Sequence, residues 1–210
     1  YVYDALKYGV PLIPHLIGGM SMVYLDRYFV TNILGTEKLG IYVVAIQIAF
    51  SLIFLQNALN QAMIPFMFEK LALNSQEGDK LVGKIFVGYI LFMALATIVL
   101  CLSSPYIYQY FIGSEFQSSQ ELVKYLAFSM FVIACTKIFI NIILFEKKTY
   151  LLSIVAILSI VFGWVLFKYF ISLHGLKGAA IASIILSSIT LFMVWLSASK
   201  LRKIKLGMGF

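Results

Sequence analysis

The most informative shortage in this sequence of 210 residues is charge, because only 12% of the residues are Asp, Glu, Lys or Arg. Soluble globular domains carry about 25% of such residues. In their place, 62% of the residues are hydrophobic, and the mean hydropathy is +0.97. This composition excludes an ordinary soluble domain and predicts a membrane protein.

Residues that commonly perform catalysis or bind metals are also scarce. The Cys, His and Asp residues of the whole sequence are Cys101, Cys135, His15, His174, Asp4, Asp26 and Asp79. None of them shows the DxD, paired-carboxylate or clustered spacing of a metal or acid–base site. We therefore expect no enzyme activity, no metal site and no cofactor. For His15 two interpretations remain open, a hydrogen-bonded structural residue and a proton carrier, since His titrates near neutral pH.

Several apolar stretches are long enough to cross a bilayer as helices, which takes about 20 residues each. The stretch 103–120 is too polar and too broken to cross, and its aromatic residues suit the interface between lipid and water. The predicted fold class is therefore all-α, a polytopic membrane protein with six transmembrane helices over residues 1–210. We place the helices at about residues 11–34, 39–67, 82–102, 122–145, 150–173 and 178–199.

The basic residues are distributed unequally between the two sides of this predicted bundle. On the side of the termini lie Lys7, Lys70, Lys80, Lys84, Lys147, Lys148, Lys200, Arg202, Lys203 and Lys205, against Lys38, Lys124, Lys168 and Lys177 on the other. Because basic loops stay in the cytoplasm, we expect both termini there. The net charge of +7 is then explained by attraction to anionic lipid headgroups, and we expect no nucleic-acid partner. The chain begins with Tyr1 and shows no signal peptide, which suggests a fragment of a longer polypeptide.

The first predicted helix carries two adjacent charged residues, Asp26 and Arg27, at membrane depth. Asp26 lies eight residues before Leu34, or about 12 Å at helical rise. Neighbouring helical residues point about 100° apart, so each of the two needs its own partner. One interpretation is a structural salt bridge to another helix. The other is an Arg27 that binds an anion beside a carboxylate that couples to a cation.

Polar residues also recur in the second and fourth predicted helices. Gln47, Asn57 and Gln61 form a polar face on the second helix, which either lines a water-filled path or makes interhelical hydrogen bonds. Lys137 lies near mid-membrane in the fourth helix and should therefore face the bundle interior or a cavity. The candidate substrate-binding residues are Asp26, Arg27, Gln47, Asn57, Gln61 and Lys137.

Small residues recur at a spacing of four in the sixth predicted helix, at Ala179, Ser183 and Ser187. Such a stripe allows two helix backbones to approach closely in a membrane. We therefore expect a neighbouring helix to pack tightly against it.

The segments that carry these residues resemble a known family. LKYGVPLIPHL, YLDRYFVTNILGTEKLGIYVVAIQIA and NQAMIPFMFE, with HGLKGAAIAS before the last helix, resemble the second half of bacterial polysaccharide and O-antigen flippases. These flippases belong to the multidrug/oligosaccharidyl-lipid/polysaccharide exporter superfamily. The resemblance covers essentially the whole chain. It implies two six-helix lobes around a central cavity with alternating access, of which this chain would be the C-terminal lobe without its N-terminal lobe.

The resemblance also implies a function. Members of this family move undecaprenyl-pyrophosphate-linked oligosaccharide units across the bacterial cytoplasmic membrane, for the synthesis of lipopolysaccharide O-antigen or capsule. On this basis Arg27 would attract the pyrophosphate or an acidic sugar, and Asp26 would orient Arg27 or sense a coupling ion. The implied partners are the lipid-linked oligosaccharide, membrane lipids, the N-terminal lobe and a polysaccharide polymerase.

Two other functions stay open at this point. An exporter of drugs or small cations from the same superfamily would depend on Asp26 and tolerate the loss of Arg27. A membrane-embedded glycan polymerase or ligase would need outward loops with an acid–base or Arg-rich site, whereas the stretch 103–120 offers only Glu115.

Overall fold

The computed structural model describes residues 9–10, 12–73 and 75–202, and all regular elements in this part of the chain are helical. The all-α fold class is thereby confirmed. Helices suit an apolar chain because each backbone group bonds within its own segment and none is exposed to lipid. The elements are α2 (Leu12–Leu34), α3 (Thr36–Ala72), α4 (Gln76–Phe111), the 3-10 helix η1 (Ser114–Ser119), α5 (Gln120–Phe145) and α6 (Tyr150–Leu201).

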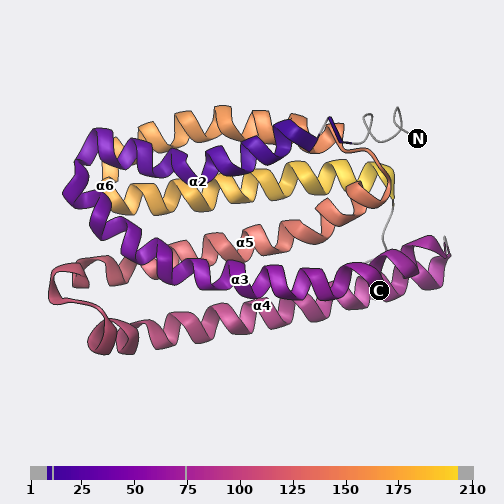
Figure 1. Ribbon diagram of the computed structural model, residues 1–210, viewed down its shortest axis with the longest axis horizontal. Helices are drawn as coiled ribbons and strands as arrows, with labels where there is room; N and C mark the ends of the chain where they lie inside the picture. Colours follow the sequence, from indigo (N-terminus) through magenta and orange to yellow (C-terminus); the bar gives the residue numbers. More distant parts are fainter. Residues whose placement is uncertain (1–8, 11, 74, 203–210) are drawn as a thin grey trace.

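Four helical segments of the described chain are long and apolar enough to cross a membrane: Thr36–Ala72, Gln76–Phe111, Ser114–Phe145 and Tyr150–Leu201. The last of these, α6, consists of two helical arms that meet at Gly175, whose φ of 58° and ψ of −136° are not helical. Figure 1 shows the two arms running in opposite directions, side by side. The chain is therefore a membrane protein built from long helices that pack lengthwise.

Helices α3 and α4 are longer than the sequence suggested, and the connections beside them are shorter than predicted. Only Gly35, with φ of 90°, separates α2 from α3, whereas the predicted helix bounds left residues 35–38 between them. Helix α4 begins at Gln76 and continues to Phe111, so residues 103–111 are not a separate interfacial segment. Pro105 lies inside this helix and cannot donate to the carbonyl oxygen of Cys101. The hydroxyl of Ser104 donates to that oxygen instead, at 3.0 Å, which allows the helix to continue.

Helix α5 lies at the centre of the bundle and contacts α3, α4 and α6. Helix α5 is the neighbour that packs closely against the small-residue stripe at Ala179, Ser183 and Ser187, which confirms the predicted close packing. The hydroxyl of Ser129 donates to the carbonyl oxygen of Ser183 at 3.1 Å, and it lies 3.4 Å from the hydroxyl of Ser187. Side chains this small let the second arm of α6 approach α5 closely enough for a hydroxyl to reach a backbone group.

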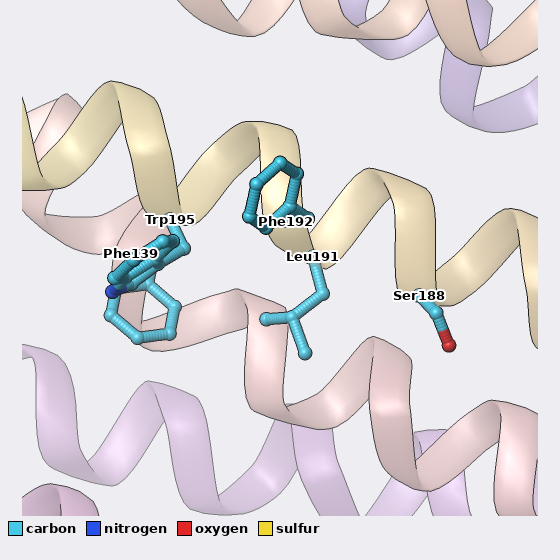
Figure 2. Close-up of a pocket in the computed structure, with 5 residues that line it drawn as sticks. All are labelled: Phe139, Ser188, Leu191, Phe192 and Trp195. Carbon is cyan, nitrogen blue, oxygen red and sulfur yellow. The ribbon is translucent and has the colours of Figure 1, made fainter.

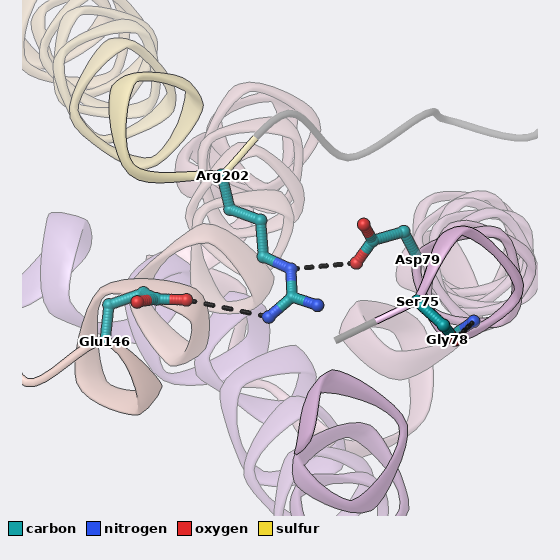
Figure 3. Close-up of polar contacts among 5 residues, drawn as sticks. All are labelled: Ser75, Gly78, Asp79, Glu146 and Arg202. Atoms are coloured by element: carbon teal, nitrogen blue, oxygen red, sulfur yellow. Dashed lines mark hydrogen bonds and ion pairs between the residues drawn. The ribbon is translucent and has the colours of Figure 1, made fainter. Parts of the chain in front are cut away.

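Arg202 connects three elements at the end of the bundle where α6 terminates (Figure 3). Its Nε donates to Asp79 in the first turn of α4 at 2.8 Å, and its Nη1 lies 3.6 Å from Glu146 after α5. The Arg202 side chain is only 10% exposed. The Ser75 hydroxyl accepts from the Gly78 backbone at 3.1 Å and thereby caps the helix that presents Asp79. This ion-pair cluster fixes the end of α6 against α4 and the α5–α6 turn.

Replacing Arg202 by Met should lower the stability of the folded protein by about 3 kcal/mol, because two partly buried carboxylates lose their shared cation. The measurement is the thermal unfolding midpoint of the purified natural protein in detergent. Lys200→Met serves as the matched control, since Lys200 is exposed and lies two residues before Arg202, in the last turn of α6. Equal midpoints for the two variants would contradict a structural role of the cluster.

Candidate functional site

Asp26 of α2 is held in the interior of the bundle and is only 9% exposed. Its Oδ1 accepts from the Arg27 backbone amide at 2.7 Å, and its Oδ2 accepts from the hydroxyl of Tyr42 at 3.2 Å. Tyr42 lies on α3 and is fully buried. The partner that Asp26 finds on another helix is therefore a phenol rather than a cation. Together the two residues link α2 to α3 a few turns from their junction at Gly35.

Arg27 lies on the adjacent side of α2 and is half-buried. Its guanidinium carbon lies 5.7 Å from the centre of the Tyr24 ring, within the range of a cation–π contact. Tyr24 and Tyr28 are 66% and 53% exposed, so this face of α2 is open in the lobe. A guanidinium beside an exposed aromatic ring on an open helix face is well placed to meet a planar anionic group.

The polar residues predicted on the second helix lie along an exposed face of α3. Gln47, Asn57 and Gln61 are all exposed, and none of them is covered by the described part of the lobe. Many exposed positions follow a helical spacing of three and four and define one stripe, beside which Asn57 is also exposed. The stripe consists of Gln47, Ser51, Phe54, Ala58, Gln61 and Pro65. Exposed amides on a membrane-spanning helix require either water or a polar partner opposite them.

A second group of amides is buried between α3 and α5. The amide nitrogen of Asn141 donates to the side-chain oxygen of Asn60 at 2.8 Å. One turn earlier on α3, Gln56 is fully buried, and its Nε2 donates to the side-chain oxygen of Asn57 at 3.3 Å. The Gln56 Oε1 atom has no hydrogen-bond partner in the structure. The candidate list did not include Gln56, Asn60 or Asn141, although the spacing of Asn141 four residues after Lys137 marks that face of α5.

Lys137 is half-buried on α5, and in the described part of the chain no hydrogen bond or ion pair is recorded for it. His15 of α2 is close enough to Lys137 to interact with it electrostatically. Both side chains are basic, so His15 does not neutralise the ammonium group. Lys137 therefore brings positive charge to the bundle without a carboxylate from the described residues.

The candidate residues fall into two groups along the bundle. Asp26 and Arg27 lie near the α2–α3 junction, Arg27 about 10 Å from the end of α2 at helical rise. Lys137 lies about 12 Å from the opposite end, where α5 stops at Phe145. In Figure 1, α2 and α3 diverge from their junction, and α5 is visible between them. The structure thus places Asp26 and Arg27 near one end of the bundle and Lys137 apart from both.

A separate apolar hollow of about 390 Å³ lies between α5 and the second arm of α6 (Figure 2). It is lined by Phe139, Ser188, Leu191, Phe192 and Trp195, and it includes none of the candidate residues. Within the described residues, no three His, Cys, Asp or Glu side chains gather where they could hold a metal ion. The hollow suits a hydrocarbon chain better than a polar ligand.

The fold and these exposed polar faces define a class: an all-helical membrane protein that leaves polar side chains exposed on its long helices. The fold is similar to that of the MATE transporter VcmN of Vibrio cholerae in its bent form, with a TM-score of 0.80 and 19% sequence identity. The similarity covers 98% of this chain and 48% of VcmN, so the chain spans about half the length of that transporter. No family model and no curated protein matches the chain.

Proposed function

We propose that this chain is one six-helix lobe of a transporter that flips undecaprenyl-pyrophosphate-linked oligosaccharides across the bacterial cytoplasmic membrane. The six helices would be α2, α3, α4, α5 and the two arms of α6. The observation that carries the proposal is the exposed polar stripe of α3, together with Arg27 on an open face of α2, in a chain whose fold is similar to half of a MATE transporter. A second lobe opposite this stripe would enclose a polar cavity.

The physical requirement for such a cavity is clear. A pyrophosphate-linked sugar cannot cross about 30 Å of hydrocarbon unaided, because each charge would lose its hydration. Amides such as Gln47, Asn57 and Gln61 can replace water around sugar hydroxyls, and Arg27 can bind a phosphate group through two parallel hydrogen bonds. The lipid tail stays in the bilayer throughout. No covalent bond needs to form or break.

The expected orientation places both termini of the chain in the cytoplasm. The ion-pair cluster of Arg202, Asp79 and Glu146 would then lie at the cytoplasmic end, and the α2–α3 junction would face outward. Arg27 would lie in the outer half of the membrane on this model. A polysaccharide polymerase on the outer side is the expected recipient of the flipped unit.

An exporter of drugs or small cations from the same superfamily is the second candidate, and the match to a MATE transporter favours it. The burial of Asp26 speaks against a direct contact between its carboxylate and a large organic cation. Of the adjacent pair, Arg27 is the more exposed. The charge that this part of the lobe presents is therefore positive, which favours an anionic substrate.

The decisive experiment locates the lipid-linked glycan in cells from which the natural gene has been deleted. We expect the unpolymerised unit to accumulate in the cytoplasmic leaflet, with rescue by the wild-type gene and no rescue by Arg27→Ala. Lys124→Ala is the matched control, because Lys124 is an exposed residue near the start of α5. Normal glycan export combined with new sensitivity to cationic toxins would refute the flippase and support the drug exporter.

A further inference from the structure

Three exposed aromatic side chains lie along the contact between α2 and the first arm of α6. They are Tyr24, Tyr28 and Trp164, which are 66%, 53% and 49% exposed. The ring centres of Tyr28 and Trp164 lie 5.9 Å apart, and the two ring planes are inclined by 46°. The two helices approach closely beside Trp164, because a Cβ at Gly163 would overlap the side chain of Leu25.

A fourth ring fixes the orientation of two of these side chains. Phe29 is only 5% exposed, and its ring meets Tyr28 at 5.3 Å and 83° and Trp164 at 5.0 Å and 86°. Such edge-to-face contacts are favourable between aromatic rings. Tyr28 and Trp164 are thus supported by a buried ring while about half of each stays exposed. A ligand that meets them finds ordered rings, which lowers the entropy cost of binding.

The depth of these rings separates them from an ordinary aromatic belt, which lies at helix ends where lipid meets water. Tyr24 lies ten residues before the end of α2 at Leu34, or about 15 Å at helical rise. Trp164 lies eleven residues before Gly175, or about 16 Å. The hydrocarbon core is about 30 Å thick, so both rings lie near its middle.

Arg27 indicates which environment this face of α2 meets. Its guanidinium carbon lies 5.7 Å from the centre of the Tyr24 ring. Helical geometry places Tyr24 between Arg27 and Tyr28 on the same side of α2. A charged guanidinium at this depth is costly in hydrocarbon, so it faces a polar space. The aromatic rings beside it therefore meet water, a polar ligand or a second lobe rather than lipid tails.

We propose that Tyr24, Tyr28 and Trp164 form a sugar-stacking platform, on which a pyranose ring of the transported oligosaccharide lies flat beside Arg27. The inference rests on the proposed function, because it identifies the part of the site that receives the glycan. A pyranose ring presents C–H groups whose partial positive charge suits the negative face of an aromatic ring. The tyrosine hydroxyls and the indole N–H can bond to the hydroxyl groups around the edge of the sugar.

The test applies saturation-transfer NMR to the purified full-length natural protein in lipid nanodiscs. The probes are the methyl glycosides of glucose, galactose, mannose, rhamnose and N-acetylglucosamine. With the wild type we expect transfer to the ring C–H protons of at least one glycoside. Trp164→Leu should weaken the binding of that glycoside about fivefold, the size of one aromatic contact. Trp164→Tyr should retain most of the binding, because it keeps an aromatic face.

Trp195→Leu is the matched control, because Trp195 is 40% exposed and lines the separate apolar hollow. It should bind the glycoside like the wild type. Equal losses in Trp164→Leu and Trp195→Leu would overturn the proposal, as would adventitious binding that all variants share or the absence of transfer to every glycoside. If Trp164→Leu lowers the unfolding midpoint and leaves glycoside binding unchanged, Trp164 only packs against its neighbours and the platform is refuted.

The glycan experiment succeeds or fails separately from this one. Glycoside binding that Trp164→Leu weakens, together with normal glycan export in the deletion strain, would keep the sugar-binding platform and refute the flippase. Full rescue of glycan export by Trp164→Leu would keep the flippase and remove the platform from its path.

Discussion

Substituting Val for Gly178 is expected to prevent the two arms of α6 from packing and to leave little folded protein. A side chain at this position would overlap the carbonyl oxygen of Phe170 in the first arm. Neither backbone can yield without breaking helical hydrogen bonds, so we expect a loss of about 3 kcal/mol or more in stability. The measurement is the yield and unfolding midpoint of the protein purified in detergent.

Gly88→Val is the matched control for this substitution. Gly88 lies in the middle of α4, and nothing lies within 4 Å of the position that its Cβ would take. A Val at this site adds a side chain without displacing a neighbour. If Gly88→Val and Gly178→Val give the same yield and unfolding midpoint, the close backbone contact at Gly178 is not what allows the two arms of α6 to pack side by side.

The second large effect is expected at the contact between Asp26 and Tyr42. Tyr42→Phe removes the hydroxyl that donates to the buried Asp26 carboxylate, which should cost about 2 kcal/mol. Asp26→Ala should cost a similar amount, because it leaves the buried hydroxyl with one partner fewer. In the double variant the two costs should not add, and the difference measures the coupling across the α2–α3 contact.

The unfolding midpoints of the two single variants and the double variant provide this coupling. Tyr24→Phe is the control, since Tyr24 lies on the same helix as Asp26 but is 66% exposed. Strictly additive effects would show that the hydrogen bond contributes nothing to stability. Asp26 would then be free for a role in coupling to a cation. Strong coupling would instead make Asp26 a structural residue that holds α2 against α3 and orients Arg27 beside it.

The charged and polar residues of the chain fall into two groups with different roles. The cluster of Arg202 with Asp79 and Glu146 joins helix ends, and the pair of Asp26 and Tyr42 joins α2 to α3. In the proposed transporter, Arg27, Lys137 and the exposed amides of α3 would face the ligand or the second lobe. The proposed transporter uses this second group, whereas the stability of the lobe depends on the first.

The amino-acid sequence by itself determined the fold class, because long apolar runs in lipid have few alternatives to the helix. It also determined which face of α3 is polar, since the spacing of Gln47, Asn57 and Gln61 follows the helical repeat and the structure leaves all three exposed. The end of α2 at Leu34 and the end of α5 at Phe145 were likewise readable, because Gly35 and the polar residues after Phe145 interrupt the apolar pattern.

Only the tertiary structure decided how the polar residues are partnered. The sequence left two interpretations of Asp26, a structural salt bridge and a site that couples to a cation. In the folded chain, its carboxylate instead accepts a hydrogen bond from the hydroxyl of Tyr42. The continuation of α4 through Pro105 depends on a hydroxyl that replaces a missing backbone donor, which local propensity does not reveal. The contact of Asn60 with Asn141 joins residues 81 positions apart, and no local pattern specifies such a pairing. Helical periodicity is a local property, whereas the identity of a partner depends on which helices the whole chain brings together.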